Sequence, residues 1–311
     1  MNEPKDEYEN NNYESAGPKT AMVAIIGRPS SGKSTFLNTA SGEPVSIVSP
    51  IPQTTRNAIK GIVNTSFGQL VFVDTPGYHQ SEKKLNLKLQ QTARDQLEAA
   101  ECVLYVIDSS RDLGQEEEMT AELVAPYAAK TVVAINKTDI PAAKPSKVRD
   151  FLLLKLKEIP NERIFEISAK NDTGINDVLK ALYDLAPVAP HLYPEEYYTD
   201  QEVGFRIAEV VRGEAINRLS DEIPHALFVE IADMEFKKEG RVLWVRAFLC
   251  VERESQKGIV IGKGASMIKT IRIESIKALR KIFDYKIDLD LQVKVVKNWR
   301  QKDMILNKVL S

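Results

Sequence analysis

Apolar and amphipathic stretches alternate along the first 185 residues of the chain. Three apolar runs have the length and continuity of strands buried on both faces: Met22–Ile26, Cys102–Asp108 and Thr131–Ile135. Between such runs, Lys84–Ala100 and Glu116–Val124 have the pattern of helices. Alternating strands and helices are typical of a doubly wound, mostly parallel sheet, so we expect an α/β domain over Ala21–Leu185.

A second pattern begins after residue 200. Its predicted elements are a helix over Gln201–Leu219, strands over Phe228–Met234 and Arg241–Val251, a short helix, a glycine turn at Gly262–Ala265, a helix over Ser266–Phe283 and a strand over Lys286–Lys297. In the last strand apolar and polar residues alternate strictly. This order of elements predicts a smaller α+β domain over residues 201–311, with the arrangement of a type II KH domain.

Two further segments lack such patterns. Residues 1–20 are polar, acidic and rich in Asn, so we expect a disordered tail. Ala186–Asp200 holds three prolines and is predicted to link the two domains. Its tyrosines, Tyr193, Tyr197 and Tyr198, are candidates for anchoring one domain on the other.

Gly27–Thr35 lies between an apolar strand and a helix and fits the phosphate-binding pattern G-x-x-x-x-G-K-[ST]. The two glycines let backbone N–H groups converge on an anion, and the helix N-terminus adds further donors. Lys33 is expected to reach the β- and γ-phosphates, and Ser34 to ligate Mg²⁺. The nucleotide-binding residues predicted in this loop are Gly27, Arg28, Pro29, Ser30, Ser31, Gly32, Lys33, Ser34 and Thr35.

Two later segments fit the parts of a GTPase that surround the γ-phosphate. Ser46–Arg56 is a loop rich in proline and hydroxyls, and it offers Thr54 and Thr55 as Mg²⁺ ligands, of which we favour Thr55. A predicted hairpin over Asn57–Val73 then ends in Asp74-Thr75-Pro76-Gly77. Asp74 is expected to hold the metal through water, and the Gly77 N–H to sense the γ-phosphate.

The choice of base is predicted from Asn136-Lys137-Thr138-Asp139, which follows a buried strand. The Asp139 carboxylate can accept two hydrogen bonds from the guanine edge, which adenine does not donate. We expect Lys137 to stack over the purine and Asn136 to brace neighbouring loops. A later strand delivers Ser168-Ala169-Lys170, where the Ala169 N–H is expected to meet guanine O6.

Composition and charge narrow the remaining possibilities. The net charge of −2 hides an asymmetry, because Lys and Arg outnumber Asp and Glu by 13 to 5 from Ser255 onward. That excess favours a polyanionic partner for the C-terminal part. Cys102 and Cys250 lie far apart in apolar runs, as reduced core residues of a cytoplasmic protein would. No apolar stretch approaches the roughly 20 residues of a membrane span, and no signal peptide is expected.

The glycine turn near the C-terminus is basic and follows an apolar run. A KH domain clamps about four single-stranded nucleotides by their backbone with such a turn. The RNA-binding residues predicted here are Lys257, Ile261, Gly262, Lys263, Gly264, Ala265, Lys269 and Arg272.

A P-loop GTPase domain followed by one KH domain resembles the Era family of bacterial GTPases. The resemblance also includes Gln53–Arg56, Pro190–Pro194, Ser255–Gly264 and Val296–Arg300. It implies GTP and GDP as ligands with Mg²⁺, and a monomer that binds the 3′ end of small-subunit (16S) rRNA in assembly of the 30S subunit. It also implies peripheral contact with the inner face of the cell membrane.

Two residues depart from the family pattern. Ser30 stands where the family usually has Asn, a side chain associated with a monovalent cation, and this weighs against potassium stimulation. Ala265 stands where the family usually has Gly, so its Cβ is expected to restrict approach of the RNA backbone and reduce affinity.

The expected reaction is Mg²⁺-dependent hydrolysis of GTP by a positioned water, with catalytic roles for Lys33, Thr54, Thr55 and Gly77. Tyr78 occupies the position at which Ras-like enzymes use Gln, which predicts slow intrinsic turnover. Two alternatives remain at this point. One is an RNA-binding assembly factor with a mainly structural nucleotide site, and the other is a membrane-linked growth or cell-cycle signalling GTPase.

Overall fold

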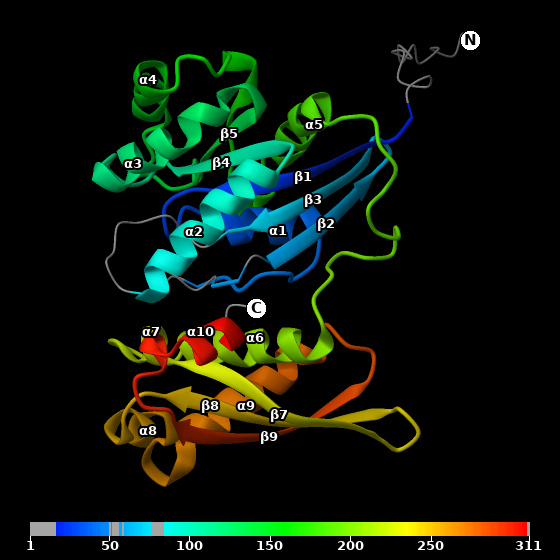
Figure 1. The fold of residues 1–311 in the computed structure, drawn as a ribbon, viewed down its shortest axis with the longest axis vertical. Coiled ribbons are helices and arrows are strands. Elements are labelled where there is room, and N and C mark those ends of the chain that lie inside the picture. The colour runs from blue at the N-terminus through cyan, green and yellow to red at the C-terminus, as the bar shows by residue number, and fades with distance from the viewer. Residues whose placement is uncertain (1–16, 50, 52–55, 58, 76–83, 310–311) are drawn as a thin grey trace, which may run out of the picture.

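The chain folds into two domains joined along one side by an extended segment (Figure 1). The structure, a computed structural model, describes residues 17–309 apart from 50, 52–55, 58 and 76–83. None of the helices in this part of the chain is long and apolar enough to cross a bilayer.

The N-terminal domain is built on a six-stranded sheet of order β2-β3-β1-β4-β5-β6. Its strands are β1 (Lys19–Ile26), β2 (Ile59–Thr65), β3 (Gly68–Asp74), β4 (Cys102–Asp108), β5 (Thr131–Asn136) and β6 (Ile164–Glu166). β2 is antiparallel to β3, and the other pairings are parallel, which confirms the doubly wound, mostly parallel sheet. β1 begins two residues earlier than the boundary expected from sequence, because Lys19 and Thr20 pair with β3 and are not part of a disordered tail.

Helices cover both faces of this sheet (Figure 1). They are α1 (Lys33–Ser41), α2 (Lys84–Ala99), α3 (Gln115–Val124), α4 (Pro145–Lys155) and α5 (Ile175–Leu185). Because side chains alternate along a strand, β1 feeds two cores. Val23 and Ile25 pack on the face of α1 and α5, whereas Ala24 and Ile26 pack on the face of α2, α3 and α4. Burial on both faces explains why the central strands are continuously apolar.

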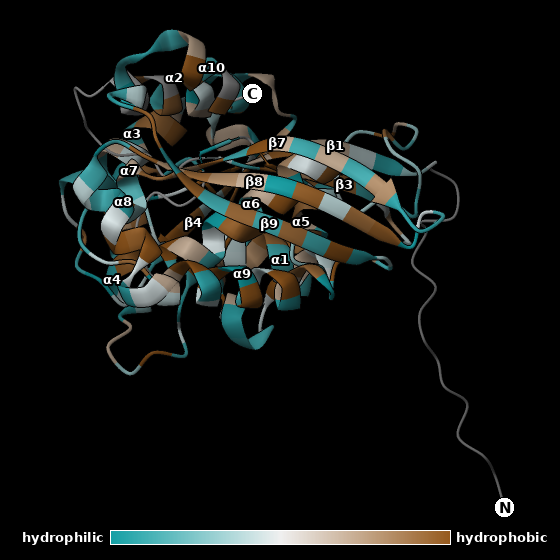
Figure 2. Cartoon of the chain, turned by 90° about the horizontal axis from the view of Figure 1, so that it is seen from below, coloured by the Kyte–Doolittle hydropathy of each residue, from teal (hydrophilic) through white to brown (hydrophobic). Residues whose placement is uncertain are grey.

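The C-terminal domain has a three-stranded sheet with helices on one face. Its elements are α6 (Val203–Ile216), α7 (Ile223–Ala226), β7 (Phe228–Lys237), β8 (Val242–Val251), α8 (Glu254–Ile261), α9 (Ser266–Leu279), β9 (Lys286–Val295), the 3₁₀ turn η5 (Trp299–Gln301) and α10 (Asp303–Val309). β8 pairs antiparallel with β7 and parallel with β9. Figure 2 shows the alternation of apolar and polar residues along these strands. The predicted order of helices, strands and glycine turn is confirmed.

The segment Ala186–Asp200 is bound to the N-terminal domain along much of its length. Tyr198 accepts a hydrogen bond at its carbonyl from the Ile62 N–H (2.9 Å), and the Thr199 hydroxyl donates to the Lys60 carbonyl (2.8 Å). Earlier in the segment, the Leu192 and Tyr193 N–H groups donate to the Gln69 side chain at 2.9 and 3.0 Å. The Tyr198 ring also packs against Arg206 of α6. Tyr198 therefore contacts both domains, as its sequence position suggested.

Candidate nucleotide site and RNA interface

The loop between β1 and α1 has a backbone that two glycines make possible. Gly32 has φ +101°, and a Cβ there would lie 2.2 Å from Nδ2 of Asn136. A Cβ at Gly27 would lie 2.3 Å from the carbonyl oxygen of Val106. Neither space admits a side chain, so the loop passes closely over the ends of β4 and β5. Its geometry is that of a cradle for phosphate at a helix N-terminus.

Lys33 lies across this loop. Its Nζ donates to the carbonyl oxygens of Gly27 (3.0 Å) and Arg28 (2.9 Å), and the side chain is buried. Burial lowers the pKa of Lys33 to about 8, while the nearby carboxylates of Asp74 and Glu117 act in the opposite direction. The ammonium is therefore held in a site where an anion would stabilise it.

The end of β3 meets the start of α1 at a cluster of oxygen atoms. The Ser34 hydroxyl donates to Oδ2 of Asp74 at 2.6 Å, and the Ser46 hydroxyl donates to the same oxygen at 2.7 Å. Asp74 is fully buried. Hydroxyl and carboxylate oxygens are the ligands that Mg²⁺ prefers, so this donor set fits the predicted metal.

Other residues predicted near the γ-phosphate lie partly outside the described structure. Thr75 is described, and its hydroxyl donates to the Ile25 carbonyl at 2.6 Å, which ties the end of β3 to β1. The residues outside the description are Thr54, Thr55, Pro76, Gly77 and Tyr78.

Asn136 braces two loops, as expected. Its Nδ2 donates to the Ser31 carbonyl at 2.9 Å, and its Oδ1 accepts from the Ala169 N–H at 3.0 Å. The second bond involves the same Ala169 N–H that is predicted to meet guanine O6, and in this structure that N–H donates to Asn136. On the far side, the Ser168 hydroxyl donates to Oδ1 of Asp139 at 2.7 Å. Asp139, in the loop after β5, and Lys170, in the turn after β6, are both exposed.

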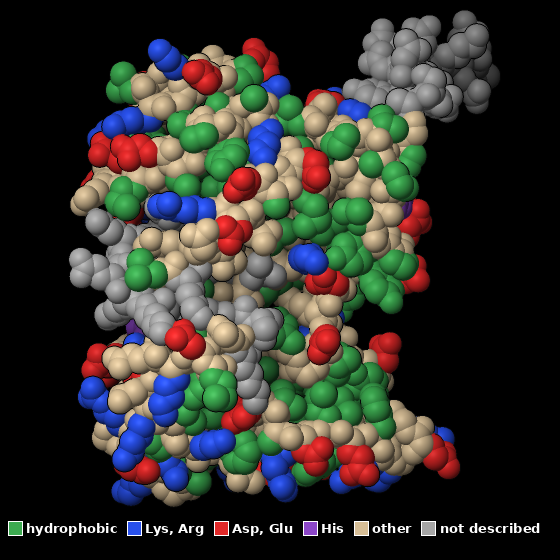
Figure 3. Space-filling model, viewed as in Figure 1, with side chains coloured by type: hydrophobic (Ala, Val, Ile, Leu, Met, Phe, Trp, Pro, Cys, Tyr) green, Lys and Arg blue, Asp and Glu red, His purple; other side chains and the backbone are tan. Residues whose placement is uncertain are grey.

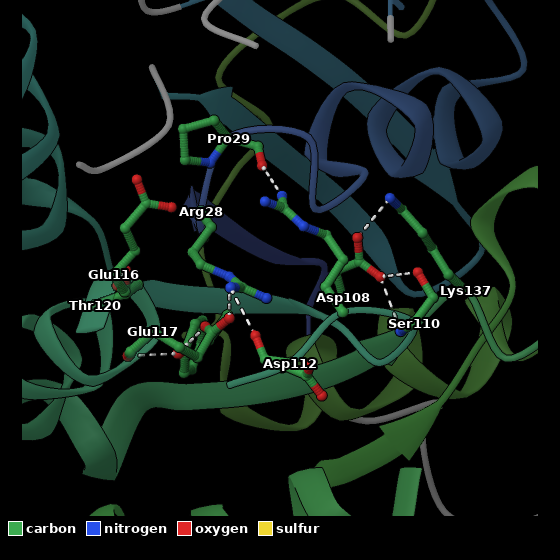
Figure 4. A network of polar contacts seen from close by, with 12 residues as sticks. Arg28, Pro29, Asp108, Ser110, Asp112, Glu116, Glu117, Thr120 and Lys137 are labelled. Atoms are coloured by element: carbon green, nitrogen blue, oxygen red, sulfur yellow. Dashed lines mark hydrogen bonds and ion pairs between the residues drawn. The ribbon is translucent and has the colours of Figure 1, made fainter. Parts of the chain in front are cut away.

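Lys137 is held by a residue that the sequence analysis left without a role. Its Nζ lies 2.6 Å from Oδ2 of Asp108, a fully buried carboxylate at the end of β4. Oδ1 of Asp108 accepts from the Ser110 N–H (2.9 Å) and hydroxyl (2.6 Å). These bonds hold the Lys137 side chain in place in the segment that follows β5 (Figure 4). The signal was available, since Asp108 ends a buried strand as Asp74 does.

Arg28 was expected to bind the nucleotide, but its side chain turns toward α3. The guanidinium forms an ion pair with Glu117 and donates to the Asp112 carbonyl at 3.2 Å (Figure 4). Glu117 in turn accepts from the Tyr105 hydroxyl at 2.5 Å. All three side chains are buried, and burial raises the pKa of Glu117 despite the opposing charge of Arg28. Arg28 therefore supports the loop from behind through a buried ion pair.

The glycine turn of the C-terminal domain connects α8 to α9 through left-handed residues. Gly262, Gly264 and Ala265 have φ values of +74°, +59° and +62°. Lys263 and Lys269 are exposed and Lys257 half-buried, and the side chains of these three lysines form no hydrogen bond or ion pair with another described residue. Figure 3 shows Lys and Arg side chains gathered at the lower left, over α8. The turn thus presents free cations beside a helix N-terminus.

Two details of the predicted RNA surface change. Arg272 is engaged with β9, because its Nε donates to the Leu289 carbonyl at 2.5 Å and its guanidinium lies 3.6 Å from Asp288. It was expected to contact phosphate, but α9 packs this side chain against the sheet. In the apolar run before the turn, Val260 is fully buried while Ile259 is 55% exposed and Ile261 half-buried. Only the two isoleucines are available to a base.

Comparison with known sequences decides the family. Residues 22–137 match the family described as 50S ribosome-binding GTPase, and residues 222–300 match the KH domain family. The GTPase Era of Treponema denticola is 60% identical over 290 residues, which cover 93% of this chain and 99% of that protein. The chain belongs to the Era family of GTPases. Era of Treponema pallidum is 44% identical and covers 95% of this chain.

Solved Era structures have the same two-domain fold. A crystal structure of an Aquifex aeolicus Era variant bound to GDP·AlF₄⁻ matches 94% of this chain and 98% of that chain, with a TM-score of 0.88 and 30% identity. A structure of Era with MgGDPNP and nucleotides 1506–1542 of 16S ribosomal RNA matches equally well. The confirmed fold class is thus a GTPase domain followed by a KH domain.

The two departures from the Era pattern lie at backbone positions of one kind. Ser30 has φ +63° and Ala265 has φ +62°. Asn tolerates the left-handed region better than Ser does, and Gly better than Ala. The Ser30 hydroxyl is buried and bonds to no other described residue. Each departure therefore places a residue less suited to the left-handed region at its position.

Proposed function

We propose that this chain is a GTP-hydrolysing switch that binds the 3′ end of small-subunit rRNA and acts in 30S assembly. The observation that carries the proposal is the oxygen cluster of Ser34 and Asp74 beside Lys33, in a chain 60% identical to an Era GTPase over 93% of its length. Support for the RNA partner comes from the Era structure with 16S rRNA and from the free lysines at the glycine turn.

In the proposed site, Ser34 and Asp74 hold Mg²⁺ together with Thr54 or Thr55. The metal, when bound, neutralises charge on the phosphates. When nucleotide binds, Lys33 gives up its hydrogen bonds to the two loop carbonyls and bonds to phosphate oxygens instead. During hydrolysis negative charge moves toward the β-phosphate, and the positive charge of Lys33 stabilises that state. Gly77 is assigned to the γ-phosphate by its place after Asp74.

Asp139 is proposed to select guanine, with Ser168 orienting its carboxylate. Asp139→Asn replaces one acceptor with a donor, so the variant should prefer xanthosine triphosphate. The exposed Asp150→Asn on α4 is the matched control. Competition between the two triphosphates for the protein measures the preference. Unchanged preference for GTP in Asp139→Asn would remove this residue from base selection.

The RNA site is proposed at Lys257, Lys263 and Lys269. Gly262→Asp is a poor probe, because a Cβ at Gly262 would lie 2.8 Å from the Met267 nitrogen and disturb the turn itself. Lys263→Glu reverses a charge on an exposed side chain and should weaken binding of a single-stranded copy of the rRNA 3′ end. Lys281→Glu, at the other end of the helical pair, is the control. Equal affinity of both variants would move the RNA site elsewhere.

The alternative function is that of an RNA-binding assembly factor whose nucleotide site is structural. Measured rates of GTP hydrolysis exclude or support it. GTP hydrolysis with and without 30S subunits separates it from a switch. The proposal also includes a monomeric state, which sedimentation tests. It further includes a cytoplasmic location with peripheral membrane contact, which cell fractionation tests. Potassium stimulation is not expected, since Ser30 has a shorter side chain than Asn.

A further inference from the structure

The phosphate loop is attached to the segment that joins β4 to α3, residues 109–114. The Arg28 guanidinium donates to the Asp112 carbonyl at 3.2 Å. The next residue of the loop is held by the same segment, because the Pro29 carbonyl accepts a hydrogen bond from the Arg111 guanidinium at 3.4 Å (Figure 4). One neighbouring segment therefore fixes two consecutive residues of the loop.

Glu117 binds the same loop from α3. Its carboxylate forms the ion pair with Arg28 and accepts a hydrogen bond from the Tyr105 hydroxyl at 2.5 Å (Figure 4). Arg28 is 4% exposed, and the other two side chains are fully buried. On α3, Glu117 shares one face with the other buried residues of the helix, which are Thr120, Ala121 and Val124. Because that face packs on the sheet, the pattern of the helix directs Glu117 inward.

The buried pair of Arg28 and Glu117 is an energetically costly way to fill this space. Both charges lose their hydration, and in several proteins apolar side chains of similar volume give equal or greater stability. Nη2 of Arg28 is buried and has no hydrogen-bond partner among the residues that the structure describes. Stability alone therefore does not account for the pair. Its contacts are directional, so they fix the place of Arg28 more closely than apolar packing does.

Arg28 also contacts the lysine that is expected to bind phosphate. Its carbonyl oxygen accepts a hydrogen bond from Nζ of Lys33 at 2.9 Å, while its side chain bonds to Glu117. A single residue thus joins α3 to the position from which Lys33 reaches the nucleotide. In phosphoryl transfer the protein contributes mainly position and charge. Since a displacement of about 1 Å is enough to lower a rate by about a hundredfold, the place of this loop matters for turnover.

We propose that Glu117 is a positioning residue for GTP hydrolysis, which through Arg28 holds the phosphate loop in the shape that fits the transition state. Tyr105 contributes by orienting the Glu117 carboxylate. The inference rests on the proposed role of Lys33 at the phosphates. It concerns the rate of the reaction more than the binding of nucleotide, because a loop that is slightly displaced still offers its N–H groups to phosphate.

Steady-state hydrolysis by the full-length protein tests the proposal. Glu117→Gln keeps the shape of the side chain and removes its charge. It should lower kcat by about tenfold and change KM by less than about threefold, because the loss falls on the reacting state. Arg28→Lys keeps a cation but lacks the forked guanidinium that bonds to Glu117 and to the Asp112 carbonyl together. This variant should lower kcat by about threefold.

A triple variant separates position from stability. Arg28→Met, Tyr105→Phe and Glu117→Leu together replace the buried polar groups with apolar ones, so none of the three side chains keeps a charge or hydroxyl without a partner. The denaturation midpoint of this protein should lie close to that of the wild type. Its kcat should still be about tenfold lower, since the directional contacts are gone. Wild-type turnover in the triple variant would overturn the inference.

A transition-state analogue measures the same effect at equilibrium and in Glu117→Gln alone. GDP with aluminium fluoride resembles the transferring phosphoryl group, and the Aquifex aeolicus Era variant described above was solved with it. In Glu117→Gln the affinity for GDP should stay within about threefold of the wild-type value, whereas the gain in affinity on adding aluminium fluoride should fall about tenfold. An equal loss of affinity with and without aluminium fluoride would show that Glu117 supports binding in general, and would reject the proposed role.

Glu252→Gln is the matched control. Glu252 forms an ion pair with Arg300 in the KH domain, and its side chain is 12% exposed. The substitution should lower stability and leave kcat unchanged. An equal loss of kcat in Glu252→Gln and Glu117→Gln would show that reduced stability is the cause, and the inference would then be wrong. Absence of GTP turnover in the unmodified protein would instead reject the proposed function.

Discussion

Lys33 illustrates how burial of one side chain prepares the site for an anion. The ammonium lies out of water, held by two carbonyl oxygens of its own loop. Its pKa of about 8 expresses the penalty of that burial, which two nearby carboxylates reduce in part. A triphosphate in the loop would favour the charged form and raise the pKa again.

Nucleotide affinity should therefore depend on pH. Above about pH 8 the free protein loses the Lys33 proton while the complex keeps it, so binding takes up a proton and affinity falls as pH rises. The decline should approach about tenfold per pH unit. Titrations between pH 6.5 and 9.5 measure it. Lys33→Ala, expected to bind about ten- to a hundredfold more weakly, corrects for titration of the nucleotide. A Kd equally flat in both proteins would contradict the prediction.

The sequence predicted which residues lie at the ends of strands, but it predicted less well which side chains those residues contact. β4 was predicted with its observed bounds, because a strand buried on both faces has an unbroken apolar run. Asp108 and Arg56 received no role, and the ion pair of Arg28 with Glu117 was not predicted, since each of the three contacts a partner distant in sequence. The bond from Arg56 to Leu227 spans 171 positions. Spacing rules describe local structure and do not identify such pairs.

At the scale of elements, α3 contributes more to the phosphate loop than its surface position suggests. Glu117 on its first turn is fully buried against Arg28 and Tyr105. The helix was predicted from its pattern of apolar and polar residues. The burial of Glu117 was not, because acidic residues are common in the first turn of helices and most of them are solvated. By contrast, α4 was missed altogether. Its leucines do not mark one face, because Leu152 is buried while Leu154 is 81% exposed.

Breaking the buried pair on α3 should be costly. Glu117→Gln leaves the charge of Arg28 without its counterion and should lower the free energy of unfolding by about 3 kcal/mol. The exposed Glu118→Gln, which loses only a 3.5 Å contact with Lys155, should change it by less than about 1 kcal/mol. Denaturant titration compares the two. A similar small effect at both positions would mean that the loop does not depend on Glu117.

The glycine turn offers a paired test of backbone strain. Ala265→Gly relieves a left-handed alanine and should raise stability by up to about 1 kcal/mol. Gly264→Ala introduces that strain one residue earlier, where a Cβ meets no atom within 4 Å, and should lower stability by a similar amount. Thermal unfolding of the two variants measures the difference. RNA affinity of Ala265→Gly should be equal or higher, and a loss would show that the methyl group contacts RNA.

Across the whole molecule, the excess of positive over negative charge lies toward the C-terminal end, in the KH domain. Single-stranded nucleic acid releases about 0.7 counterion per phosphate neutralised, so contacts by Lys257, Lys263 and Lys269 predict a slope of about −2 for log affinity against log salt. Each Lys→Ala change should reduce the slope by about 0.7. Binding isotherms at several salt concentrations give the slope. GTP affinity measured in the same series serves as the internal control.

The hydrogen bonds from the linking segment to β2 and β3 also decide where the chain can be cut. A protease requires a length of backbone that leaves the surface, and Ala186–Asp200 is bound at Leu192, Tyr193, Tyr198 and Thr199. No Lys or Arg lies between Lys180 and Arg206, so trypsin finds no site within it. A glutamate-specific protease does, at Glu195 and Glu196. The rate of cleavage there would measure how often this segment detaches from the edge of the sheet. That measurement needs no signal from a bound nucleotide or RNA.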